Sequence, residues 1–280
     1  MPYRIMASRH SAFYSPLLCC VQQLRAQGIA ASYDVLKPGQ RTYELLRDRH
    51  VDIMQSAVSS NWSLMENGAG PLPVHFAQIN RRDGFFIVAR QADPAFAWKK
   101  LEGTALLADH GLQPLVMLKY ALKYNGVDWG KIRVIDAGAP DKMEAAFRAG
   151  NGDYLHQQGP VAAGEIVAPV GAAMPPVAFS SLCCAREYQQ TQDYAAFVEF
   201  YGRAKEWVQS VDPGEVAAAE AEFFPQVARS ILAATVRRYQ SLGCWAGGID
   251  IPRDLYEQAL NVFESSGAIS RRHRFEEVVR

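Results

Sequence analysis

The residues of this 280-residue chain that could do chemistry gather at the ends of short apolar runs. Imidazole, amide and hydroxyl groups stand there beside aromatic rings. This mixture suits a flat, neutral or weakly charged small molecule that is held by ring contacts and a few directed hydrogen bonds. Because loop residues often carry binding functions, we take these side chains as ligand-binding candidates. They are His10, Tyr14, Ser56, Ser59, Trp62, His110, Gln113, His156 and Gln157.

Backbone N–H groups and an arginine could hold an acidic part of such a molecule. Gly39-Gln40 and Gly138 precede predicted helices, and a helix N-terminus favours an anionic group. An arginine of the pair Arg81-Arg82 could grip a carboxylate or sulfonate with its two-pronged guanidinium. Adjacent side chains of a strand point to opposite faces, so at most one of them faces the ligand. The candidates here are Gly39, Gln40, Asn80, Arg82 and Gly138, and which of residues 80–82 points inward stays open.

Patterns typical of catalysis or of metal binding do not stand out. We find no Ser-His-Asp order, no paired-carboxylate spacing and no Gly-rich phosphate loop, and neither Cys-x-x-Cys nor His-Glu-x-x-His occurs. The five cysteines are odd in number, and four of them form two adjacent pairs, so they predict no disulfide framework. We therefore assign no catalytic residue, no metal and no cofactor.

The elements that must position the candidates recur along the chain. A strand at 4–7, a helix from 16, a strand at 33–36, a helix at 42–49 and a strand at 51–55 return in the same order from 104 to 157, about a hundred residues later. Any two βα units look somewhat alike, but here five elements keep one spacing. The sequence therefore predicts an α/β protein of two similar lobes, each with a parallel-rich sheet flanked by helices.

Two apolar runs predict how the lobes are joined. Residues 83–90 and 175–182 read as two crossing strands. Lobe one then comprises residues 1–84 and 182–280, with a largely helical C-terminal part, and lobe two comprises 85–181. The candidate residues follow the carboxyl ends of strands, where open parallel sheets bind ligands. We therefore expect a binding cleft between the lobes.

Composition excludes several partners. Lys and Arg total 29, as do Asp and Glu, so no excess charge would draw nucleic acid or an anionic membrane surface. Hydrophobic residues make up 49%, which is enough for a large core. No apolar run is long enough to span a bilayer. The first residues read as a strand and not as a secretory signal, which keeps a cytoplasmic location open.

The order of elements resembles the type II periplasmic-binding-protein fold. More narrowly, it resembles the NMT1/THI5-like and sulfonate-binding substrate-binding proteins of ABC importers. The likeness rests on the segments Tyr14-Ser15-Pro16-Leu17, Arg82-Asp83-Gly84-Phe85, Leu101-Glu102-Gly103-Thr104 and Ala146-Phe147-Arg148-Ala149-Gly150. It implies a two-lobe clamp that closes on a small solute by hinge bending and hands the solute to an ABC permease. The solute would be aromatic, heteroaromatic, or a small organic acid or sulfonate, and the location periplasmic.

The same resemblance implies an alternative function. Related cytosolic enzymes make a thiamine pyrimidine precursor and carry a cysteine-rich run near the second crossing. Here that place reads Ser181-Leu182-Cys183-Cys184-Ala185-Arg186, with two cysteines of the four. Two thiolates leave a metal short of soft ligands, which disfavours the enzyme.

Overall fold

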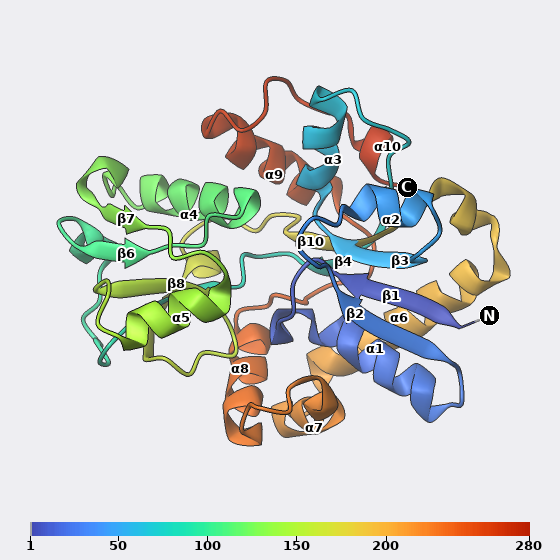
Figure 1. The fold of residues 1–280 in the computed structure, drawn as a ribbon, viewed down its shortest axis with the longest axis horizontal. Helices are drawn as coiled ribbons and strands as arrows, with labels where there is room; N and C mark the ends of the chain where they lie inside the picture. The colour runs from blue at the N-terminus through green and yellow to red at the C-terminus, as the bar shows by residue number, and fades with distance from the viewer. Residues whose placement is uncertain (1) are drawn as a thin grey trace.

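Two five-stranded sheets form the framework of the computed structural model, which describes residues 2–280 (Figure 1). The first sheet has the order β2-β1-β3-β10-β4 and the second the order β7-β6-β8-β5-β9. In each, three neighbouring strands are parallel and the fourth runs antiparallel to the strands beside it. The first sheet contains β1 (Tyr3–Ala7), β2 (Ala31–Val35), β3 (Ile53–Ser56), β4 (Val74–Asn80) and β10 (Ser180–Cys184). The second contains β5 (Phe85–Ala89), β6 (Ala105–Leu107), β7 (Arg133–Ile135), β8 (Tyr154–Gln158) and β9 (Glu165–Pro169).

The predicted duplication is confirmed by this topology. The series β1-α1-β2-α2-β3 builds one half and β6-α4-β7-α5-β8 the other. Each long helix buries an apolar stripe at helical spacing, and each ends just before a glycine with positive φ, Gly28 at 76° after α1 and Gly126 at 70° after α4. The helices of the two series are α1 (Ser15–Ala26), α2 (Thr42–Arg47), α4 (Leu112–Tyr124) and α5 (Pro140–Arg148).

Helices of the C-terminal part return to the first sheet and also reach the second lobe. α6 packs along α1, whereas α9 contacts α4 and α8 lies at the junction between the lobes (Figure 1). The remaining α-helices are α3 (Val58–Glu66), α6 (Gln192–Ser210), α7 (Pro213–Ala219), α8 (Arg229–Ser241), α9 (Arg253–Ser265) and α10 (Phe275–Val278). Short 3-10 helices are η1 (Ala12–Tyr14), η2 (Trp98–Leu101), η3 (Trp129–Lys131), η4 (Val170–Ala172), η5 (Arg186–Gln190) and η6 (Ala221–Phe223). Among the described helices, none has the length and apolar character that crossing a bilayer requires.

The lobes are joined by short segments and not by two long crossing strands. The predicted run 83–90 is mostly β5 of the second sheet, and 175–182 ends in β10 of the first. The crossings are residues 81–84 and 170–179, and they hydrogen-bond to each other, since Val177 N donates to Arg81 O at 3.0 Å and Phe179 N to Asn80 O at 3.1 Å. The exact lobe boundaries, 84/85 and 181/182, stay a prediction.

The two crossings touch most closely at Gly171. A Cβ atom there would lie 2.2 Å from the carbonyl oxygen of Asp83, so only glycine fits without a backbone shift. We expect Gly171→Ala to lower the free energy of unfolding by about 1–3 kcal/mol, as overpacking of a tight site does. Urea denaturation measures this loss.

Gly202→Ala is the matched control. Gly202 lies within α6, where an added Cβ meets only Ile249 at 3.9 Å. There the substitution should stabilise by about 0.5–1 kcal/mol through helix propensity. Equal effects of the two variants would contradict the tight crossing.

Candidate ligand-binding cleft

An ion pair crosses the space between the lobes. Arg9 follows β1 in lobe one, and Asp109 follows β6 at the equivalent place in lobe two. Arg9 Nη2 lies 2.9 Å from Asp109 Oδ1, and Nη1 contacts Oδ2, so the contact is bidentate. The exposed fraction of the side chain is 29% for Arg9 and 6% for Asp109. The two lobes therefore meet through opposite, largely buried charges.

The carboxyl group of this pair is held in its charged form. Burial alone raises the pKa of Asp109, but the hydrogen bonds and positive charge of Arg9 and the N–H of Gly111 outweigh it and leave the pKa below its ordinary value. Gly111 N donates to Asp109 Oδ1 at 2.8 Å. Charge-assisted bidentate contacts of this kind are the strong ones among hydrogen bonds.

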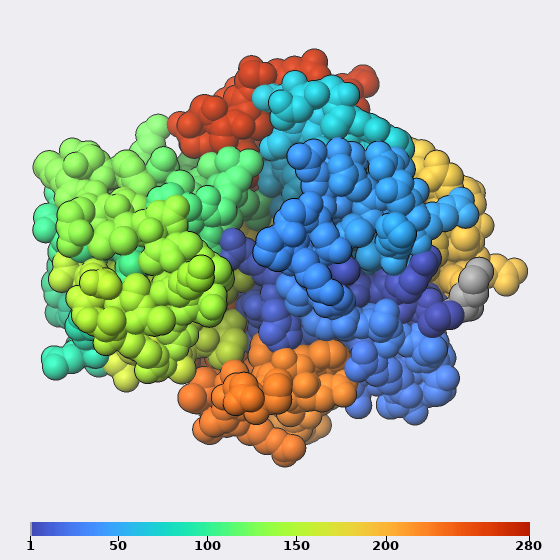
Figure 2. Space-filling model, in the orientation of Figure 1, coloured from blue at the N-terminus to red at the C-terminus, as the bar shows by residue number. Residues whose placement is uncertain are grey.

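Two pockets open on either side of the ion pair, in the furrow between the blue and green lobes (Figure 2). The first, of about 280 Å³, lies between the loops that follow β3 and β6, and we call it the serine pocket. The second, of about 400 Å³, lies between the loops that follow β1, β7 and β8, and we call it the acidic pocket. Both are lined by Ser8, Arg9, Phe85 and Gln158. One cleft, divided by the ion pair, therefore faces both lobes.

The serine pocket collects hydrogen-bond donors. Ser56, Ser59 and Ser60 line it together with the first residues of α4. The helices α3 and α4 begin there after Ala57 and Gly111, and neither residue supplies a side-chain cap. The first turns of both helices thus line this end of the cleft, and a helix N-terminus favours an anionic group.

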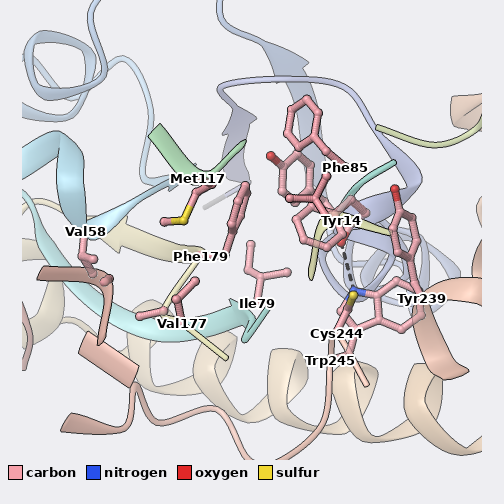
Figure 3. Packing of buried hydrophobic residues seen from close by; sticks show 14 of the residues in the cluster. Tyr14, Val58, Ile79, Phe85, Met117, Val177, Phe179, Tyr239, Cys244 and Trp245 are labelled. Carbon is pink, nitrogen blue, oxygen red and sulfur yellow. Dashed lines mark hydrogen bonds between the residues drawn. The ribbon is translucent and has the colours of Figure 1, made fainter. Parts of the chain in front are cut away.

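Aromatic side chains form the floor beneath the pockets. Phe85 and Phe179 reach the cleft, and Tyr14 lies beside Phe85 (Figure 3). Trp245 packs against Tyr239 deeper in the core, and its Nε1 donates to Phe13 O at 2.9 Å (Figure 3). A rigid ring surface of this kind suits a flat ligand.

Six of the predicted ligand-binding residues come together in this cleft. They line one pocket or the other, and two of them also connect the lobes, since Ser59 Oγ donates to Gln113 Oε1 at 2.6 Å. The six are His10, Tyr14, Ser56, Ser59, Gln113 and Gln157. No finding tests whether any of them touches a ligand, so their role stays a prediction.

Three other predicted residues lie where a ligand in these pockets would not reach them. Trp62 belongs to the core of lobe one, where its Nε1 donates to Tyr256 Oη at 2.8 Å. Asn80 is buried and donates to Phe13 O at 2.8 Å, and Arg82 donates to Gly171 O at 2.8 Å within the crossings. Their polar atoms serve internal contacts.

Both remaining histidines are also turned away from the pockets. His110 Nδ1 lies 2.8 Å from Ala108 O in its own loop. His156 is fully buried and stacks on Phe85, with ring centroids 4.4 Å apart. Burial lowers the pKa of His156 to about 3, which keeps its ring neutral at neutral pH.

The predicted glycine positions serve turns. Gly39 and Gly138 have φ of 86° and 85°, and Gly138 N donates to the Asp136 carboxylate at 2.9 Å. Gln40 Oε1 accepts from Lys37 N at 2.8 Å. None of the three lines the two pockets.

Arg9 and Asp109 were not among the predicted site residues. They fall within the predicted ligand loops, and the hundred-residue offset of the repeat pairs them directly. Opposite charges at equivalent positions of the two copies are the signal that could have identified Arg9 and Asp109. Identical residues at equivalent positions instead point to His10 and His110, which each follow one residue later.

The cysteines do not form a reactive centre. Cys183 and Cys184 are buried in β10, and burial raises the pKa of both thiols, that of Cys184 to about 12. Within residues 2–280 no cluster of three or more His, Cys, Asp or Glu residues is arranged to hold a metal ion.

Comparisons with solved structures support the fold. No family model matches the chain. A protein of Bacillus subtilis (strain 168) described as "Putative binding protein YtlA" is 23% identical over 96% of this chain and 85% of its own length. Among solved structures, the zinc-bound ligand-binding component of an ABC-type import system from Staphylococcus aureus has a TM-score of 0.77 at 13% identity, over 100% of this chain and 97% of that one. The periplasmic aliphatic sulphonate-binding protein SsuA from Escherichia coli has a TM-score of 0.73 at 14% identity, over 100% and 92%. The chain thus has the SsuA-like type II periplasmic-binding-protein fold.

Asp83 at the first crossing makes the stability of this fold depend on pH. Its Oδ1 accepts from Phe85 N at 2.6 Å, while its Oδ2 is buried without a partner among the described residues. The pKa of the Asp83 carboxyl is raised to about 7. Burial is the main cause and the negative charge of Asp109 adds to it, whereas the hydrogen bond from Phe85 N lowers the pKa. The folded state therefore binds this proton more tightly than the unfolded chain, whose value is 3.8.

The stabilisation that the protonated Asp83 adds to the free energy of unfolding is fully present below about pH 4 and is lost as the pH rises through about 7. We expect Asp83→Asn to flatten the fall in the free energy of unfolding between these pH values, because the amide keeps the Oδ1 acceptor and does not titrate. Urea titrations across the range measure the slope. Asp136→Asn, at a half-exposed carboxylate, is the control. An unchanged slope in Asp83→Asn would contradict this account.

Proposed function

We propose that this chain is the solute-binding protein of an ABC importer and clamps a small molecule in the cleft between its lobes. The observation that supports this proposal most strongly is the cleft itself, because equivalent loops of both lobes line it on either side of Arg9. The fold supports this proposal, because solved structures that share it are described as the ligand-binding component of an ABC-type import system and as a periplasmic aliphatic sulphonate-binding protein.

Two short crossings allow such a clamp to move. Residues 81–84 and 170–179 are the places where the chain passes between the sheets, so a motion that opens the cleft would bend the chain there. A ligand that contacts both lobes at once selects the closed arrangement. The boundaries of lobe one at 1–84 and 182–280 and of lobe two at 85–181 are part of this proposal.

The cleft favours an aromatic or heteroaromatic solute, or a small organic acid or sulfonate. The acid group would lie in the serine pocket, where Arg9, hydroxyl groups and two helix N-termini offer donors. A flat body would lie on Phe85 and Phe179. Among structures with this fold, the E. coli protein binds aliphatic sulphonate, and the alkanesulfonate-binding protein SsuA of Xanthomonas axonopodis pv. citri is bound to MOPS.

From the binding role we infer a permease partner and a periplasmic location. The S. aureus structure is described as part of an ABC-type import system and the E. coli protein as periplasmic. The alternative, a cytosolic synthase of a thiamine pyrimidine precursor, requires metal-binding thiolates. The buried, protonated thiols of Cys183 and Cys184 do not supply them.

Ligand binding is tested by thermal shift with a library of small acids, sulfonates and heteroaromatic compounds. A solute that binds only the folded state adds RT ln(1 + [L]/Kd) to its stability, so at least one class should raise the melting temperature. Arg9→Gln should weaken that binding about tenfold or more, since a charge-assisted bond is lost.

Arg25→Gln is the control, because Arg25 pairs with Glu222 on the surface of lobe one, away from both pockets. A library that shifts the melting temperature at no member would contradict the proposed function. Equal affinities of the two arginine variants would move the site away from the cleft.

A further inference from the structure

The ion pair that divides the cleft joins equivalent positions of the duplicated halves. Arg9 and Asp109 each follow the first strand of their half, and their side chains meet between the lobes. A motion that closed or opened the cleft would therefore also bring the two charges together or draw them apart.

Neither charge has another full partner in the cleft. Besides Arg9, the N–H of Gly111 and the imidazole of His156, which is neutral at neutral pH, act on Asp109. The buried carboxyl of Asp83 also interacts with Asp109, as a like charge and not as a partner. The ion pairs and hydrogen bonds described for the Arg9 guanidinium go to Asp109 alone. A bound group that takes only one member of the pair would leave the other charge buried without compensation, which is strongly unfavourable.

The two pockets differ in the groups that they offer. The serine pocket presents hydroxyl and helix N–H donors, and Arg9 is its only charged lining residue. The acidic pocket presents the carboxylates of Asp109 and Asp141, and the Arg9 that also lines it is the partner of Asp109. It also contains Gln157, whose Oε1 is buried without a partner among the described residues and whose residue is 7% exposed. One pocket thus suits an anionic group and the other a cationic donor.

We propose that the ligand is a zwitterion whose acidic and basic groups replace the Arg9–Asp109 ion pair, the acid binding Arg9 in the serine pocket and the ammonium binding Asp109 in the acidic pocket. This inference rests on the proposed binding function and narrows its ligand class. The exchange keeps every buried charge paired, and it lets the ligand connect the two lobes as the ion pair does in its absence.

Matched probes test the ligand class on the wild-type protein. Taurine and isethionate share one sulfonate and chain length and differ in an ammonium against a hydroxyl. Aminohexanoate and hydroxyhexanoate form a longer pair, and butylamine supplies a lone cation. We expect at least one amino acid or amino sulfonate to bind about tenfold or more tightly than its hydroxy partner, the gain of one charge-assisted contact, with no binding of butylamine.

Variants then assign the preference to the ion pair. Asp109→Asn should abolish or reverse the preference for the amino compound over its hydroxy partner, because the site then keeps an uncompensated arginine. Asp136→Asn, a carboxylate outside both pockets, should leave it unchanged. Small-angle scattering without ligand measures the radius of gyration, which increases when the lobes move apart. Asp109→Asn should have a larger radius of gyration than Asp136→Asn.

The outcomes separate this inference from the function on which it rests. Tighter binding of the hydroxy acids to the wild type, or an Asp109→Asn protein as compact as the wild type, would overturn the role of the pair. Binding of hydroxy acids alone would leave the binding function standing with another ligand class. No response to any probe or to the wider library would contradict the binding function, and with it the zwitterion.

Discussion

The arrangement of this molecule depends on a buried ion pair that spans the gap between its two halves. A charge taken out of water must be compensated, so Arg9 and Asp109 constrain how the lobes can sit against each other. Parallel strands place the loops that carry them at facing edges of the two sheets. The chain passes between the two sheets at the crossings 81–84 and 170–179, which are hydrogen-bonded to each other. The cleft and its two pockets on either side of the ion pair follow from this geometry.

Most of the fold could be predicted from the sequence because its signals are local and repeated. Apolar strands, helical spacing and terminating glycines such as Gly28 and Gly126 recur with one offset, and a duplication leaves few topologies to choose from. The crossings were harder to predict. A continuous apolar run such as 83–90 does not show where it leaves one sheet and joins the other, since that depends on partners distant in the sequence.

The site was predictable to the level of loops and not of side chains. Ser59 and Gln113 were predicted and do meet, but Trp62, in the same helix α3 as Ser59, points into the core because α3 packs toward α9. His110 stands beside Asp109 in sequence, yet its ring binds its own loop. Such orientations are set by tertiary contacts. The contribution of α8 through Tyr239, which accepts from Gly159 N at 2.8 Å, joins residues 80 positions apart and left no sequence signal.

The position of a bound solute tests the central claim most directly. A crystal structure of the protein with the compound that stabilises it most should show that compound between the lobes, in contact with Arg9 and with at least one residue of lobe two. Density for the compound on the outer face of either lobe, with the Arg9–Asp109 contact and the two pockets unchanged, would contradict the account.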